Sequence, residues 1–173
     1  LMINYENGIG WDYRFRTISV PTPTPTPNDT TPPVVTGVSV SPQAADVSEG
    51  PQTVQVIYTA TDDISGVAHN TGYVSGLVFT SPSSAQTVKI NAGTFVLTSG
   101  TAQNGQHSGT VTFPQFAESG AWQLTNMLVE DGAGNLLSLG SAAIENLGLN
   151  VSVQIVSVSD TTPPVVTGVS VNP

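Results

Sequence analysis

The sequence predicts an all-β fold, a sandwich of about seven to nine antiparallel strands. Many short runs rich in Val, Ile, Thr and aromatic residues are separated by Gly, Asn and Ser turns, as in β-sandwiches. No window shows the 3.6-residue apolar period of a helix, although residues 142–147 could form a single helical turn. A third observation, an internal repeat, places the boundaries of the domain.

The expected strands follow one another through the whole of that domain. Two prolines, Pro32 and Pro33, precede the first strand and prevent earlier ladder pairing. The predicted strands are 34–40, 54–60, 74–80, 87–90, 94–98, 108–113, 121–130, 135–139 and 151–158. The alternation of apolar residues along these runs predicts that Tyr58, Phe113 and Trp122 belong to the core.

The repeat is a 14-residue segment that occurs twice. Residues 29–42 read DTTPPVVTGVSVSP and residues 160–173 read DTTPPVVTGVSVNP, so that only Ser41 and Asn172 differ. The copies begin 131 residues apart (160 minus 29). We therefore expect one complete repeat over 29–159, followed over 160–173 by the first strand of the next repeat.

Two further segments precede the repeat. Residues 21–28 form a Thr-Pro-rich linker, because alternating proline holds the chain in an extended, polyproline-like form. Residues 1–20 end with Trp11, Tyr13 and Phe15 at every second position, on one face of an expected strand. This alternation predicts the C-terminal strand or strands of a preceding domain.

The composition excludes several classes of function. The net charge is −9, with 12 acidic and 3 basic residues, so a phosphate backbone or an anionic lipid surface would be repelled. The chain has no cysteine, which excludes disulfides, zinc–thiolate sites and thiol catalysis. We expect no nucleic-acid partner, and no run is apolar and long enough for membrane insertion within this fragment.

Three sequence features resemble the bacterial immunoglobulin-like repeats, of the Big and fibronectin III-like kind, of large surface and secreted proteins. They are the DTTPP opening, the acidic turn TDDISGV over 61–67, and EDGAGN over 130–135 after a strand that carries Trp. The resemblance covers 29–159 and implies an immunoglobulin-like β-sandwich. It also implies an extracellular or cell-surface location, and a role as stalk, spacer, adhesive module or accessory domain.

The acidic turns contain a candidate calcium site. Asp62 and Asp63 follow one predicted strand, while Asp131 and Asn135 follow another. If both turns lie at the same end of the sandwich, their side chains supply four of the six to eight oxygen ligands that calcium takes. Asp29 or Asp160 could add a ligand at a domain junction. The alternative interpretation is that these are ordinary turn residues whose side chains bond their own backbone.

Other reactive residues carry weaker hypotheses. His69 and His107, the only histidines, would need a third ligand to bind zinc. Lys89 lies between Val88 and Ile90, so it is solvated rather than crosslinked if those two face the core. No nucleophile motif is present, and we expect no enzyme activity.

We therefore expect a non-catalytic structural or adhesive module that spaces or joins domains in a larger extracellular repeat protein, with calcium as its candidate cofactor. Its expected partners are neighbouring repeats of the same chain, other subunits, and cell-surface glycans or proteins. One alternative is a carbohydrate-binding or accessory module of a secreted hydrolase. The other is a subunit of an extracellular filament or viral appendage, assembled through pairing of exposed strands.

Overall fold

The structure is a computed structural model that describes residues 28–69, 76–158, 160 and 162–171. The expected strand of a preceding domain (1–20) and the linker up to residue 27 lie outside the described residues, as does the first part of the strand expected over 74–80.

The described residues form eleven strands, one α-helix and one 3₁₀ turn. They are β1 (Val34–Ser41), β2 (Ala44–Asp46), β3 (Gln52–Thr61), β4 (Val67–Ala68), β5 (Gly76–Thr80), β6 (Thr87–Asn91), η1 (Ala92–Thr94), β7 (Val96–Gly100), β8 (Asn104–Phe113), β9 (Gly120–Asp131), β10 (Leu136–Gly140), α1 (Ser141–Asn146) and β11 (Ser152–Val156). None of the helices described is long and apolar enough to cross a membrane.

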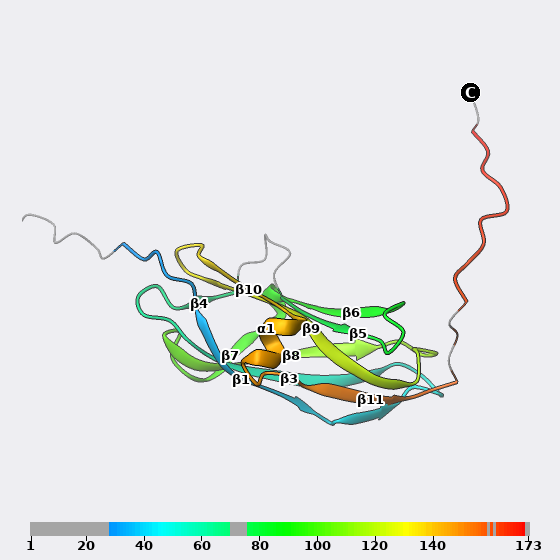
Figure 1. Cartoon of the computed structure of the whole chain (residues 1–173), viewed down its shortest axis with the longest axis horizontal. Coiled ribbons are helices and arrows are strands. Elements are labelled where there is room, and N and C mark those ends of the chain that lie inside the picture. The colour runs from blue at the N-terminus through cyan, green and yellow to red at the C-terminus, as the bar shows by residue number, and fades with distance from the viewer. Residues whose placement is uncertain (1–27, 70–75, 159, 161, 172–173) are drawn as a thin grey trace, which may run out of the picture.

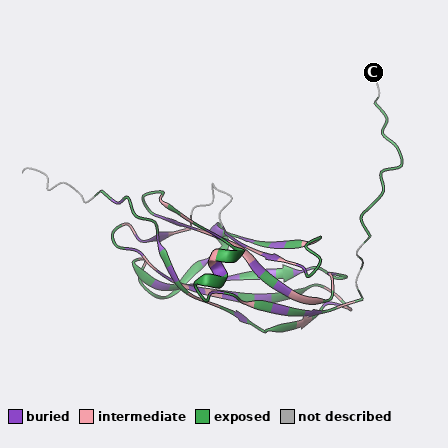
Figure 2. Ribbon diagram, in the orientation of Figure 1, coloured by how far each residue is buried: buried purple, intermediate pink, exposed green. Residues whose placement is uncertain are grey.

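The strands build two facing sheets, which confirms the predicted all-β sandwich (Figure 1). One sheet has four strands in the order β1-β3-β8-β7. The other has seven, in the order β2-β11-β9-β5-β6, with β10 and β4 also paired to β9. Buried and exposed residues alternate along the strands (Figure 2), because successive side chains of a strand point to opposite faces of its sheet.

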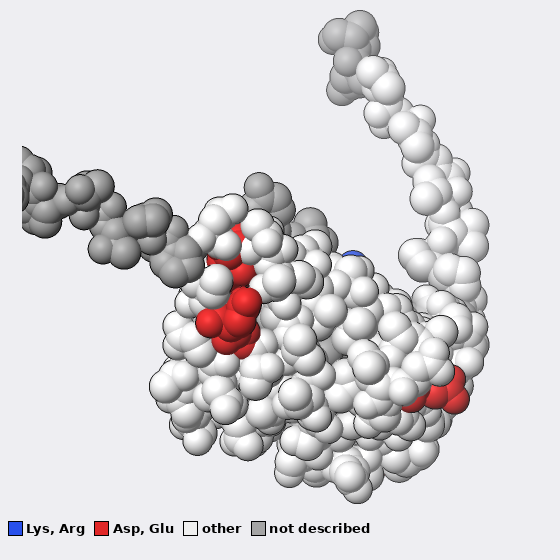
Figure 3. Space-filling view, turned by 60° about the vertical axis from the view of Figure 1, so that its left-hand side comes forward, with Lys and Arg blue, Asp and Glu red and all other residues white. Residues whose placement is uncertain are grey.

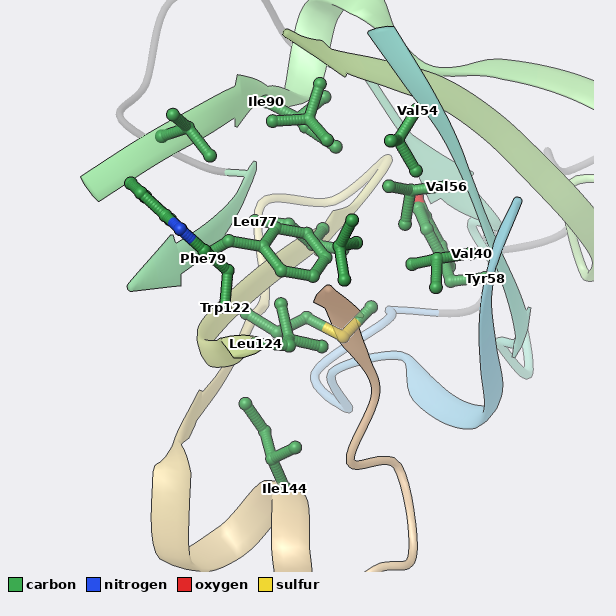
Figure 4. Packing of buried hydrophobic residues seen from close by; sticks show 14 of the residues in the cluster. Val40, Val54, Val56, Tyr58, Leu77, Phe79, Ile90, Trp122, Leu124 and Ile144 are labelled. Atoms are coloured by element: carbon green, nitrogen blue, oxygen red, sulfur yellow. The ribbon is translucent and has the colours of Figure 1, made fainter. Parts of the chain in front are cut away.

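The core lies between the sheets and contains the aromatic residues predicted for it. Trp122 is 1% exposed, Tyr58 2% and Phe113 not at all. Figure 4 shows side chains of the two sheets facing one another across this core. At one side Ile144 of α1, also 1% exposed, packs against the core cluster, so this short helix belongs to the fold and is not a surface insertion.

The strand count and one pairing differ from the expectation. Eleven strands form where seven to nine were expected, because β2 and β4 are only three and two residues long and carry no readable alternation. The pairing of β2 with β11 is parallel. This follows from the chain path: β1 and β2 are separated by Pro42 and Gln43 and join different sheets. The strands therefore are not antiparallel throughout.

The chain enters and leaves the sandwich at opposite ends (Figure 1). At the entry end, the start of β1 pairs with the end of β3, Val34 opposite Thr61. At the exit end, the last residues of β11 pair with the first of β9, Ile155 opposite Gly120. Because β9 has 12 residues that each rise about 3.3 Å, the two ends are roughly 35 Å apart.

Candidate metal centre

Three aspartates from distant parts of the sequence meet at the entry end. Asp29 lies five residues before β1, Asp62 directly follows β3, and Asp131 is the last residue of β9. The pairing of β1 with β3 brings the first two together, and β4 joins the third to them because Val67 pairs with Asp131. The registers of the sheets therefore produce this cluster.

Asp62 is held by the turn that follows it. Its Oδ1 accepts hydrogen bonds from the main-chain amides of Ile64 (3.2 Å) and Gly66 (2.5 Å). Gly66 has a φ of +78°, which suits glycine in this turn. The other carboxylate oxygen, Oδ2, is buried and has no hydrogen-bond partner. A buried acceptor without a partner is costly and calls for a physical explanation.

Asp131 is completely buried and is held by its own turn. Its Oδ1 accepts from the main-chain amides of Ala133 (2.9 Å) and Asn135 (2.8 Å). Its Oδ2 accepts from the side-chain Nδ2 of Asn135 at 2.7 Å. The same amide lies 3.3 Å from the main-chain oxygen of Asp29. Asn135 therefore connects the turn after β9 to the segment before β1.

Asp29 is fixed by residues on both sides of the cluster. Its Oδ1 accepts from the amide of Thr31 (3.1 Å) and its Oδ2 from the amide of Ser65 (2.9 Å). Hydrogen bonding by Ser65, first through its side chain, and by Thr31 lowers the pKa of Asp29. Asp63 lies outside this arrangement: its side chain is exposed, and its Oδ1 accepts from Thr31 Oγ1 at 2.7 Å.

One carboxylate oxygen from each of Asp29, Asp62 and Asp131 lies within 4.8 Å of the others, and all three residues are buried. At such a separation, two negative charges repel each other by at least about 3 kcal/mol for an effective dielectric constant of about 20. Figure 3 shows acidic side chains gathered in a patch at this end, and the visible basic surface lies away from it. The cluster thus concentrates negative charge, and none of the described residues that donate hydrogen bonds to its carboxylates is basic.

A divalent cation would reverse the sign of these interactions. Calcium prefers oxygen ligands and tolerates irregular geometry, whereas magnesium demands a near-ideal octahedron. Two of the four predicted site residues, Asp62 and Asp131, bring carboxylates to the cluster, and Asn135 contacts it. Asp29, predicted only as a junction ligand, supplies the third carboxylate, while Asp63 and Asp160 lie elsewhere.

The two histidines form a second cluster, in which His107 is buried and His69 is half-buried. His107 is 1% exposed, and its Nδ1 lies 2.8 Å from Nε2 of His69. Its ring stacks on Tyr58 with centroids 4.9 Å apart. Burial lowers the pKa of both imidazoles, and with the charge of His69 it brings that of His107 to about 4. No third ligand for zinc stands beside the pair among the described residues.

Two strands show how their alternation places Lys89 and His107. Val88 and Ile90 are buried and Lys89 is exposed, as the alternation of β6 predicts. Along β8, every second residue from Gly105 to Phe113 is buried. Extending the alternation of Val111 and Phe113 backwards would therefore have placed His107 in the core.

Comparison of the chain with protein-family models, curated proteins and solved structures finds no significant match. The geometry described above is accordingly the basis for any assignment of function.

Proposed function

We propose that residues 29–159 form a non-catalytic, immunoglobulin-like module of an extracellular repeat protein. In this proposal the module spaces or joins neighbouring domains, and calcium bound at the entry end stiffens it. The observation that carries the proposal is the path of the chain. It enters at one end of the sandwich and leaves at the other, and a copy of its opening segment follows immediately. Such a unit can be joined head to tail without a turn in the chain.

The carboxylate cluster supports the calcium part of the proposal. Asp62 Oδ2 has no partner, and Asp29 and Asp131 each direct an oxygen to the same small region. Rotation of the Asn135 amide by half a turn would replace its Nδ2 by Oδ1 and add a fourth oxygen from a side chain. Main-chain carbonyls and water would complete the coordination shell, as they do in many calcium sites.

The proposal predicts a calcium-dependent increase in thermal stability. An ion that binds only the native state stabilises it by about 2.7 kcal/mol at a concentration of 100 Kd. For a domain of this size we expect the unfolding temperature to rise by roughly 10 °C between excess chelator and saturating calcium. Differential scanning calorimetry of the full chain measures this difference.

Two variants separate a bound ion from a general salt effect. Asp131→Asn should abolish the calcium-dependent shift, whereas Asp63→Asn, an equally small change at an exposed aspartate outside the cluster, should retain it. Equal unfolding temperatures of the unmodified chain in chelator and in millimolar calcium would contradict the metal part of the proposal.

The alternative of a carbohydrate-binding module draws little support from the described aromatic residues. A sugar-stacking surface needs exposed aromatic rings, but Tyr58, Phe113 and Trp122 are all buried. Phe116, 47% exposed, is the one aromatic among the exposed large hydrophobic residues of the described chain.

The filament alternative concerns the segment after residue 160. Val165, Val166, Val169 and Val171 are 79–88% exposed and need a covering sheet. The segment has the sequence of β1, and in the present module the position beside β3 is already occupied by β1 itself. If a second chain inserted its own copy of the segment there, the displaced β1 would be exposed instead. Strand exchange would therefore bury no additional apolar surface. We therefore favour a following module over strand exchange as the covering partner.

A further inference from the structure

Asp160 occupies in the repeat the position that Asp29 occupies at the entry end. It begins the second copy of DTTPP, and the local geometry is already repeated there. Asp160 Oδ1 accepts from the amide of Thr162 at 3.0 Å, as Asp29 Oδ1 accepts from that of Thr31 at 3.1 Å. The hydrogen bond from the amide two residues later, one of those that hold the Asp29 carboxylate, is thus also formed at Asp160.

The main chain of Asp160 is held by the exit end of the present module. Its amide donates to the carbonyl oxygen of Phe116 at 3.1 Å, and its own carbonyl accepts from Nε2 of Gln86 at 3.1 Å. Gln86 is itself fixed, because its Oε1 accepts from the amide of Glu118 at 2.9 Å. The position of Asp160 relative to the sandwich is therefore set by three residues of the exit end.

The side chain of Asp160 thus accepts a hydrogen bond that matches one at Asp29, while its main chain is bonded to the exit end. We infer that Asp160 is the first metal ligand of a following copy of this module, so that its side chain binds an ion in that copy while its backbone stays bonded to this one. The inference rests on the calcium site proposed above, which is supported by the buried Asp62 Oδ2 that has no hydrogen-bond partner. The partner of the metal site is then the exit end of the preceding module.

In the inferred arrangement no linker separates the two modules, because Asp160 belongs to both. A flexible linker allows neighbouring domains to adopt many orientations, and each added residue widens that range. Here the residue that ends one module's hydrogen bonding is the residue that begins the next module's ion coordination. Binding of the ion therefore fixes the angle between the modules, and its removal leaves only the two backbone hydrogen bonds of Asp160.

The test extends the full chain after Pro173 with residues 43–159, which completes a second copy in register. Because the protein has no cysteine, Thr110→Cys and the same change in the second copy provide two spin labels on exposed strand positions. Pulsed electron resonance then measures the distance distribution between the modules. We expect a narrow distribution in calcium that broadens in chelator.

Asp160→Asn in this tandem protein separates the junction from the site itself. We expect the number of calcium ions bound, measured by calorimetric titration, to fall from two to one, and the distribution to stay broad in calcium. Gln86→Ala should broaden the distribution while both ions remain bound. Gln106→Ala, an exposed glutamine of β8 away from the exit end, is the matched control and should change neither measurement.

The outcomes distinguish the two proposals. If the original chain binds calcium but the Asp160→Asn tandem keeps two ions and a narrow distribution, the junction inference is overturned and the metal site stands. An unchanged distribution on chelation of a calcium-binding tandem also overturns it. If the original chain binds no calcium at all, both proposals fail together.

Discussion

Acid should weaken the fold through the histidine pair, in which His107 is buried. The hydrogen bond between His69 Nε2 and His107 Nδ1 needs one nitrogen as donor and one as acceptor, so a proton added at that bond breaks it. His107 Nε2 is buried and has no hydrogen-bond partner, so a charge on this ring would be poorly solvated. Tyr58, which stacks on His107, stays neutral because burial raises the pKa of its hydroxyl.

The size and direction of the effect follow from the two pKa values of His107. In the unfolded chain the pKa has its ordinary value of 6.5, and in the folded protein it is about 4. Between these values the unfolded state binds more protons, so stability falls as the pH falls. One pKa unit corresponds to about 1.4 kcal/mol, which gives about 2 kcal/mol lost by pH 5 and about 3 kcal/mol by pH 4. Above pH 7 this contribution is complete and constant.

Urea unfolding at intervals from pH 7.5 to pH 5 measures this loss above the range in which ordinary carboxylates titrate. His107→Leu, which has similar volume and cannot be protonated, is the comparison. The variant's stability at pH 7.5 will differ, but the decrease between pH 7.5 and pH 5 should be smaller by about 2 kcal/mol. Equal decreases in the two proteins, or a flat profile in the unmodified one, would refute the assignment of this pH dependence to His107.

Three further substitutions test the cluster, the sheet packing and the helix. In chelator, Asp62→Asn should raise the free energy of unfolding by about 1–3 kcal/mol by removing carboxylate repulsion, and calorimetry of this variant should find no calcium-dependent change in unfolding temperature. A lower stability of the variant in chelator would argue against uncompensated charge in the cluster. Gly109→Ala would place a Cβ 2.9 Å from the ring of Phe95, so urea unfolding should show a stability lower by about 1–3 kcal/mol. An unchanged urea midpoint would contradict the close packing of Gly109 against Phe95. Ile144→Ala should cost about 2–5 kcal/mol in the same assay, whereas a loss below about 1 kcal/mol would mean that α1 is peripheral.

Much of the fold was readable because most strands are long enough to alternate. The run over 121–130 and the repeat at 34–40 both match observed strands to within a residue or two. Strands β2 and β4 were missed because three and two residues cannot display a period. The parallel pairing of β2 with β11 depends on where the chain crosses between sheets, which no local pattern records.

Two of the four residues predicted for the site, Asp62 and Asp131, contribute carboxylates to the observed cluster. Placing Asp62 and Asp131 together needed only the idea that turns at one end of a sandwich cluster. Asp63 lies outside the cluster because neighbouring side chains in a turn point in different directions, which sequence alone does not assign. The place of Asp29 in the cluster depends on the register of β1 with β3, and the histidine pair depends on a contact between β8 and the residue that follows β4.

The opposite placement of entry and exit ends has a mechanical consequence. A pull on the two flanking segments acts along β1 and β11, which run in the direction of the load. The hydrogen bonds between β1 and β3 stand perpendicular to that direction, so tension shears them together instead of opening them one at a time. A chain of such units would transmit force through whole ladders. An ion at Asp29 would anchor the first loaded residue to the ends of two other strands.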